Sequence, residues 1–267
     1  MTKIGLFDSG VGGLTVLKEL IASMPHESYV YFGDTARYPY GGKSQETITR
    51  YSIENSAFLI DQGAELIAIA CHTATSLALD TLQSTFSIPV LGVIEPAVEK
   101  MIATTQNKRL GVIGTRATIA SGMYQRELLA YLPDASITAL ACPLFVPLIE
   151  EQITSLEILR LVIKETLAPF KDKKIDTLLL GCTHYPLLAE LIQHEMGPDV
   201  QLVNPAKTFT EKLKKLNLPQ SPKCESKFFV SDDPARFKAI GEAFLGIPMG
   251  FVEQVSLNPN YAIGSAL

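Results

Sequence analysis

The sequence predicts an α/β protein made of two pseudosymmetric domains with mainly parallel sheets. Short apolar runs alternate with amphipathic stretches of helix length, this pattern occurs twice, and no long linker or low-complexity segment interrupts it. Strands that alternate with helices are typical of βαβ units, in which successive strands lie parallel. A chain of 267 residues has room for one large domain or for two of about 130 residues each.

The apolar runs and the amphipathic stretches give the expected elements in order. The expected strands are residues 4–7, 29–32, 65–70, 90–93, 110–113, 137–141, 176–180 and 201–203. The expected helices are residues 14–24, 48–62, 75–85, 119–131, 158–170 and 186–194.

The two halves of the chain resemble each other. The run KIGLFD at residues 3–8 opens the first half, and RLGVIG at 109–114 opens the second. In each half a later apolar strand runs into a cysteine, Cys71 or Cys182. We therefore expect a first domain of residues 1–97 plus 208–267, on the Cys71 side, and a second of residues 98–207, on the Cys182 side. Ligands of open α/β sheets bind at the carboxyl ends of the strands, so both cysteines should face one cleft.

Composition limits the class of protein and its location. Lysine and arginine number 23 against 28 aspartates and glutamates, a net charge of −5, which argues against a nucleic-acid partner. No stretch reaches the roughly 18 apolar residues of a membrane span, and the first residues lack the pattern of a signal peptide. The four cysteines have no CxxC spacing. Together these features predict a reduced, cytoplasmic protein that does not bind membranes.

Histidine and threonine accompany both cysteines. His72 and Thr73 follow Cys71, whereas Thr183 and His184 follow Cys182. A thiol serves as an acid or base when its pKa is matched to the working pH, and a nearby imidazole, hydroxyl or helix N-terminus can lower that pKa. One interpretation is a pair of buried structural cysteines. The recurrence at both strand ends favours a pair of acid/base thiols.

Two other kinds of site, a zinc site and a dinucleotide site, fit the sequence less well than a pair of acid/base thiols. Zinc fits two cysteines and two histidines by number, but adjacent Cys71 and His72 would point to opposite sides of an extended chain. We therefore expect no metal. The glycine-rich run at residues 7–15 approaches the dinucleotide fingerprint, with Asp34 near the position of the ribose-binding acid, but Thr15 replaces the third glycine. A purely structural turn is the remaining interpretation of this run.

Three further positions could serve a small ligand. Asp8, at the start of the glycine-rich run, suits contact with an ammonium group or control of a neighbouring thiol. The turn-rich loop at residues 32–42 could offer backbone donors and the Tyr40 hydroxyl. Glu150 is either an ordinary acid at a helix start or a partner that orients His184.

Seven segments together resemble the glutamate racemases of the cofactor-independent aspartate/glutamate racemase superfamily. They are IGLFDSGVGGLTVL (4–17), YFGDTARYPYGGKS (31–44), ACHTATS (70–76), PVLGVIEPA (89–97), GVIGTRATIAS (111–121), CPLFVPLIE (142–150) and GCTHYPLL (181–188). The resemblance covers residues 4 to about 205 in family order and spacing. It implies two α/β domains with the substrate between them, and a C-terminal segment that rejoins the first domain.

The resemblance also implies a mechanism without pyridoxal phosphate or metal. Cys71 and Cys182 correspond to two acid/base cysteines on opposite faces of the substrate α-carbon, the first serving D-glutamate and the second L-glutamate. Asp8 and His184 correspond to groups that assist them, with Glu150 supporting His184. The positions that correspond to substrate contacts are Asp8, Ser9, Tyr40, Gly41, His72, Thr73, Thr183 and His184. The implied product is D-glutamate for peptidoglycan, made by a homodimer.

One position departs from the family pattern, because His72 stands where the family usually has asparagine. We expect His72 to keep a hydrogen bond to the substrate and to alter affinity or pH dependence. The departure leaves two alternatives open: a racemase of aspartate or another acidic amino acid, and a weakly active or non-catalytic binding protein on the same fold. A nicotinamide enzyme is a more distant alternative.

Overall fold

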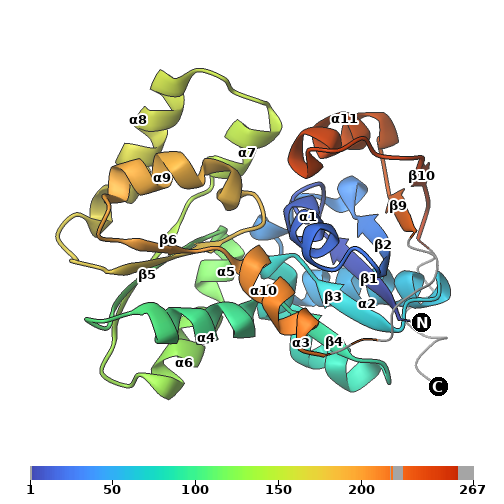
Figure 1. Ribbon diagram of the computed structural model, residues 1–267, viewed down its shortest axis with the longest axis horizontal. Coiled ribbons are helices and arrows are strands. Elements are labelled where there is room, and N and C mark those ends of the chain that lie inside the picture. The colour runs from blue at the N-terminus through green and yellow to red at the C-terminus, as the bar shows by residue number, and fades with distance from the viewer. Residues whose placement is uncertain (1, 217, 219–224, 258–267) are drawn as a thin grey trace.

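The computed structural model describes residues 2–216, 218 and 225–257, and shows two parallel β-sheets side by side (Figure 1). The first sheet has the strand order β10-β9-β2-β1-β3-β4. Its strands are β1 (Lys3–Asp8), β2 (Ser28–Gly33), β3 (Leu66–Ile69), β4 (Val90–Gly92), β9 (Ser226–Val230) and β10 (Val252–Gln254).

The second sheet repeats the central topology of the first. Its order is β6-β5-β7-β8, which corresponds strand for strand to β2-β1-β3-β4. The strands are β5 (Arg109–Gly114), β6 (Ser136–Ala141), β7 (Thr177–Gly181) and β8 (Gln201–Val203). The similarity of the two halves in the sequence therefore reflects two copies of one parallel arrangement, with β3 and β7 in equivalent places.

Helices cover both faces of each sheet (Figure 1). The α-helices are α1 (Leu14–Ser23), α2 (Gln45–Asp61), α3 (His72–Thr85), α4 (Ile94–Thr104), α5 (Arg116–Ala120), α6 (Met123–Tyr131), α7 (Phe145–Glu150), α8 (Leu156–Leu167), α9 (Ala189–Met196), α10 (Pro205–Lys214) and α11 (Pro234–Leu245). Short 3₁₀ helices lie at η1 (Thr35–Arg37), η2 (Tyr40–Gly42), η3 (Ala168–Phe170) and η4 (Tyr185–Leu188).

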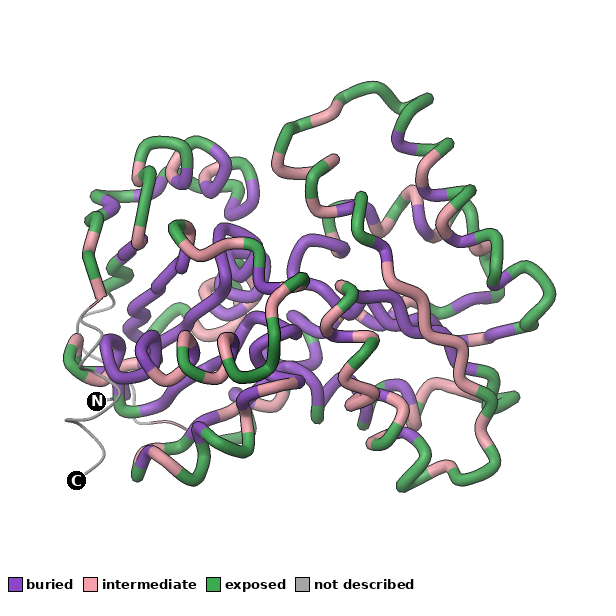
Figure 2. The backbone as a smooth tube through the Cα atoms, turned by 180° about the vertical axis from the view of Figure 1, so that it is seen from behind, coloured by how far each residue is buried: buried purple, intermediate pink, exposed green. Residues whose placement is uncertain are grey.

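Alternation along the strands divides the core of each sheet into two layers. In β1, Ile4 and Leu6 pack with α1 and α11, whereas Phe7 packs with α2 and α3 on the other face. In β7, Leu178 and Leu179 are likewise divided between the α8–α9 side and the α4–α6 side. Burial on both faces explains why these strands are continuously apolar, and Figure 2 shows the buried chain running through the middle of the molecule.

The structure confirms the α/β fold class and contains a strand at each of the eight expected places. The expected helix at 119–131 is wrong as a single element, because Gly122, with φ +65°, separates α5 from α6. The structure also contains elements that were not expected from the sequence: β9, β10, α4, α7, α10 and α11. Within the described ranges, no helix has both the length and the apolar character needed to cross a membrane. Cys224 and residues 258–267, part of the expected first domain, lie outside the described residues.

Candidate active site

The carboxyl ends of the strands in both sheets meet at a cavity of about 210 Å³. Residues from both halves line it. Nine of the predicted site residues are among them: Ser9, Tyr40, Gly41, Cys71, His72, Thr73, Cys182, Thr183 and His184. The other two, Asp8 and Glu150, contact lining residues from behind, through Thr183 and His184 respectively. The structure therefore brings all eleven predicted positions to one place.

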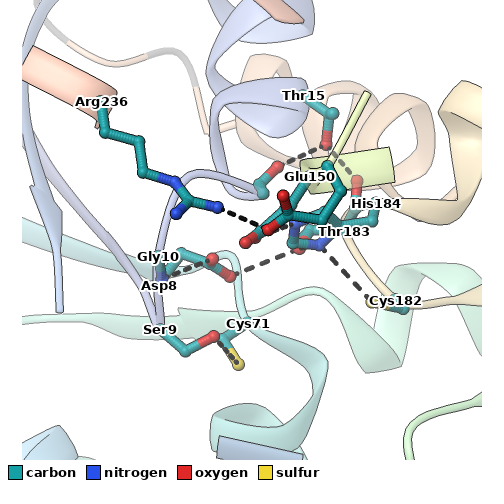
Figure 3. A network of polar contacts seen from close by, with 12 residues as sticks. Asp8, Ser9, Gly10, Thr15, Cys71, Glu150, Cys182, Thr183, His184 and Arg236 are labelled. Carbon is teal, nitrogen blue, oxygen red and sulfur yellow. Dashed lines mark hydrogen bonds and ion pairs between the residues drawn. The ribbon is translucent and has the colours of Figure 1, made fainter. Parts of the chain in front are cut away.

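Cys71 lies at the N-terminus of α3, directly after β3. Its sulfur accepts a hydrogen bond from the Ala74 N–H at 3.5 Å, and its thiol faces the Ser9 hydroxyl at 4.0 Å (Figure 3). Burial raises the pKa of Cys71 to about 12, and the negative charge of Asp8 acts in the same direction. This thiol is therefore protonated at neutral pH and is equipped to give a proton.

Cys182 has a different partner, although it follows β7 as Cys71 follows β3. His184 Nδ1 lies 3.8 Å from the Cys182 sulfur, and His184 Nε2 lies 2.8 Å from Glu150 Oε1. Burial alone would lower the pKa of His184, but hydrogen bonds to Cys182 and Glu150 outweigh it and raise the pKa to about 10. The ring is therefore an imidazolium at neutral pH, and it places a positive charge beside the Cys182 sulfur.

The glycine-rich loop after β1 contacts the surroundings of both cysteines. Asp8 accepts a hydrogen bond from the Gly10 N–H at 3.0 Å and faces the Thr183 hydroxyl at 3.5 Å. Burial raises the pKa of Asp8, although the positive charge of His184 opposes this. A Cβ atom at Gly12 would come within 2.3 Å of His184 Cε1, so this glycine is needed for close packing. The run at residues 7–15 thus lets one half of the molecule contact the other.

His72 has no polar partner in the described part of the chain. It is the first residue of α3, is only 3% exposed, and lines the cavity with both ring nitrogens unpaired. Its ring centroid lies 6.4 Å from that of Tyr124. Burial lowers the pKa of His72 to about 3, so the ring is neutral over the physiological range. An effect of His72 on pH dependence near neutral pH is therefore not expected, whereas its hydrogen bond to the substrate and its effect on affinity stay predictions.

The prediction for the Tyr40 hydroxyl also needs correction. This hydroxyl donates to Asp34 and accepts a hydrogen bond from Asn55 at 3.0 Å, so it is used inside the loop rather than facing a ligand. Tyr40 still borders the cavity. Asp34 is fully occupied as well, because Arg37 and Ser231 supply its other hydrogen bonds. This carboxylate has no lone pair left for a ribose hydroxyl.

Several lining residues were not assigned a role from the sequence: Tyr38, Thr115, Arg116 and Cys142. The Thr115 hydroxyl lies 2.9 Å from that of Thr73, and both contact Thr118, at 2.9 and 3.2 Å. Thr115 follows β5 as Ser9 follows β1, so the internal similarity contained a signal for it. Cys142 follows β6 and contacts the Leu140 carbonyl at 3.8 Å.

Comparison with known proteins gives the family. The model of the Asp/Glu/Hydantoin racemase family matches residues 12–213. A glutamate racemase from Geobacter metallireducens is 48% identical over 260 residues, which cover 95% of this chain and 96% of that protein. The chain belongs to the Asp/Glu/Hydantoin racemase family.

Solved structures of racemases share the fold over nearly the whole chain. Glutamate racemase isoform RacE1 from Bacillus anthracis matches with a TM-score of 0.91 and 36% identity, over 96% of this chain and 98% of that one. Glutamate racemase from Francisella tularensis, solved in complex with D-glutamate, matches with a TM-score of 0.89 and 41% identity at the same coverage. Among the described residues of the chain, there is no group of three or more His, Cys, Asp or Glu side chains that could hold a metal ion.

Proposed function

We propose that this protein is a glutamate racemase, which interconverts L- and D-glutamate by two-cysteine acid/base chemistry. The observation that carries the proposal is that thiols from two equivalent strand ends, Cys71 and Cys182, line one cavity. A racemase needs a base on one face of the α-carbon and an acid on the other, and two topologically equivalent strands from opposing sheets supply that arrangement.

The different environments of the thiols assign their starting roles. From L-glutamate, the Cys182 thiolate takes the α-proton while the His184 imidazolium, supported by Glu150, offsets the sulfur's charge before the transfer. The carbanion formed at the α-carbon then takes a proton from the Cys71 thiol on the opposite face. The reaction leaves D-glutamate, a Cys182 thiol and a Cys71 thiolate. D-glutamate reacts by the same steps in reverse.

The remaining site residues bind and orient the amino acid. Their proposed roles rest on their positions in the cavity wall and on the family motifs that contain them. Asp8 faces Thr183 and adjusts the charge around Cys71. The residues proposed to contact the substrate are Ser9, the backbone of Tyr40 and Gly41, His72, Thr73 and Thr183.

The proposal also covers the product, the location, the oligomeric state and the domain division of the enzyme. D-glutamate for peptidoglycan is the product expected of this family, made in the cytoplasm by a homodimer. We also propose the division into residues 1–97 with 208–267 and residues 98–207. It is supported by the pairing of β9 with β2 in the first sheet, whereas β5 to β8 form the second.

The test is NMR of the α-proton in D₂O, with L- and D-glutamate supplied separately and no cofactor added. Each enantiomer should lose its α-proton signal. Early in the reaction the product should carry deuterium while the remaining substrate keeps protium, because separate thiols remove and deliver the proton. Aspartate and glutamine are tested alongside. If aspartate exchanges its α-proton and glutamate does not, the substrate is aspartate rather than glutamate. If no acidic amino acid exchanges its α-proton, the proposed function is wrong.

A further inference from the structure

Arg116 is a cation at the cavity with no assigned role. It is the first residue of α5, is exposed, and borders the cavity beside Thr115. Among the described residues that line this cavity, it is the only lysine or arginine. A guanidinium binds a carboxylate with two parallel hydrogen bonds, so its place at a site for an acidic amino acid is chemically specific.

Several arginines of the molecule are held by internal partners, whereas Arg116 is free. Arg160 also has no ion pair or side-chain hydrogen bond among the described residues, but it does not line this cavity. Arg37 is bound by Asp34 and Glu54, and Arg236 pairs with Glu151 at 2.8 Å. In the part of the chain that the structure describes, Arg116 has neither an ion pair nor a hydrogen bond from its side chain. Its guanidinium therefore has no internal ion pair or hydrogen bond to break before it meets an anion.

Charge is distributed unevenly around the cavity. Asp8 and Glu150 act through Thr183 and His184, beside Cys182. Next to Arg116 the cavity is lined by the hydroxyls of Thr73 and Thr115, which hydrogen-bond each other and the buried Thr118 behind them, with no carboxylate among these groups. A substrate with an ammonium group near Asp8 would thus extend its other charged end toward neutral donors and a cation.

We propose that Arg116 is a specificity-determining residue that attracts and binds the side-chain carboxylate of glutamate at the mouth of the cavity. This inference rests on the proposed function. Arg116 does not touch the reacting proton, so its removal weakens binding of substrate and transition state alike and raises KM rather than lowering kcat. The attraction acts through solvent, so added salt weakens it.

The test compares Arg116→Ala, Arg116→Lys and the control Arg160→Ala, which removes an exposed arginine on α8 away from the cavity. We expect the alanine variant to raise KM for both enantiomers about tenfold with kcat within about twofold, and to flatten the salt dependence of kcat/KM. The lysine variant should recover part of the loss, and Arg160→Ala should match the wild type. An unchanged KM, an unchanged salt dependence, or a loss confined to kcat would overturn the proposal.

A binding measurement separates this proposal from the racemase function. D-glutamate should raise the midpoint of thermal unfolding of the wild type and of Arg116→Lys more than that of Arg116→Ala. If the wild type exchanges no α-proton yet shows this difference, the proposed function fails and the carboxylate site stands. If all the proteins shift equally, the Arg116 proposal fails whether or not they racemise glutamate.

Discussion

The ends of β3 and β7 occupy equivalent places in two similar sheets, and each carries a cysteine with a histidine beside it. Their electrostatics are opposite. His184 is bonded through both nitrogens, to Cys182 and Glu150, and its pKa rises to about 10. His72 has no partner for either nitrogen among the described residues, and its pKa falls to about 3.

This contrast shows that partners in space, rather than neighbours in sequence, set the charge of a buried imidazole. Both histidines are almost fully buried, so desolvation acts on both. On the Cys182 side the histidine has an additional partner, Glu150, which comes from α7, 34 residues before His184. Two copies of one backbone arrangement can therefore place their strand-end cysteines beside histidines of opposite charge state.

The largest effect expected from this comparison is on the thiols themselves. Cys71→Ala and Cys182→Ala should each lower racemisation about 1,000-fold or more, since either change removes the proton donor or acceptor on one face. Cys142→Ala is the matched control, because Cys142 lines the same cavity and burial raises its pKa to about 12. Steady-state racemisation by circular dichroism measures all three. A loss in Cys142→Ala equal to the other two would contradict the two-thiol assignment.

The next effect tests the charge on the Cys182 side. His184→Asn should lower kcat about 100-fold. Glu150→Gln should lower it about tenfold and move the alkaline limb of the pH profile to lower pH, because loss of the Glu150 charge lowers the pKa of His184 from about 10. Glu151→Gln, which changes the neighbouring exposed glutamate that pairs with Arg236, should leave the limb in place.

Thermodynamics restricts how the difference between the Cys71 side and the Cys182 side can appear in the kinetic constants. L- and D-glutamate have equal free energy, so kcat/KM must be the same in both directions for every active variant. The asymmetry between the thiols appears instead in kcat and KM taken separately.

A Glu150→Gln enzyme whose alkaline limb stayed in place would show that Glu150 does not support the charge of His184.

Periodicity and internal similarity predicted the parts of the molecule that depend on local pattern. Both cysteine-bearing strands and the shared cavity follow from apolar runs that end at Cys71 and Cys182. The short β10 and the strand β9, which begins Ser226-Lys227 at exposed positions, have too weak a pattern to be recognised. The break at Gly122 depends on a backbone conformation that a helical apolar pattern does not reveal.

Hydrogen-bond partners from distant segments were beyond prediction for a different reason. Whether the Tyr40 hydroxyl faces a ligand or Asp34 depends on how a loop folds on α2, and Asp34 is completed by Ser231, 197 residues away. Burial of His72 likewise depends on how its surroundings pack in three dimensions. Residue type and spacing identified the candidates, whereas their protonation and orientation required the packed structure.

The smallest effect expected here concerns stability on the Cys71 side. Because the folded pKa of His72 is about 3 and its ordinary value is 6.5, the unfolded chain binds a proton below pH 6.5 that the folded chain does not. The resulting contribution to stability is complete above pH 6.5 and is lost as the pH falls toward 3. Between pH 7 and pH 5 the loss is about 2 kcal/mol.

His72→Asn removes this titration and inserts the residue that the sequence resemblance leads us to expect at this position. The difference in free energy of unfolding between variant and wild type, measured by urea denaturation, should therefore shift by about 2 kcal/mol in favour of the variant from pH 7 to pH 5. The matched control is His194→Asn, an exposed histidine on α9, which should follow the wild type. Parallel curves for His72→Asn and wild type would mean that His72 is hydrated or paired in solution, and the contrast with His184 would then rest on Glu150 alone.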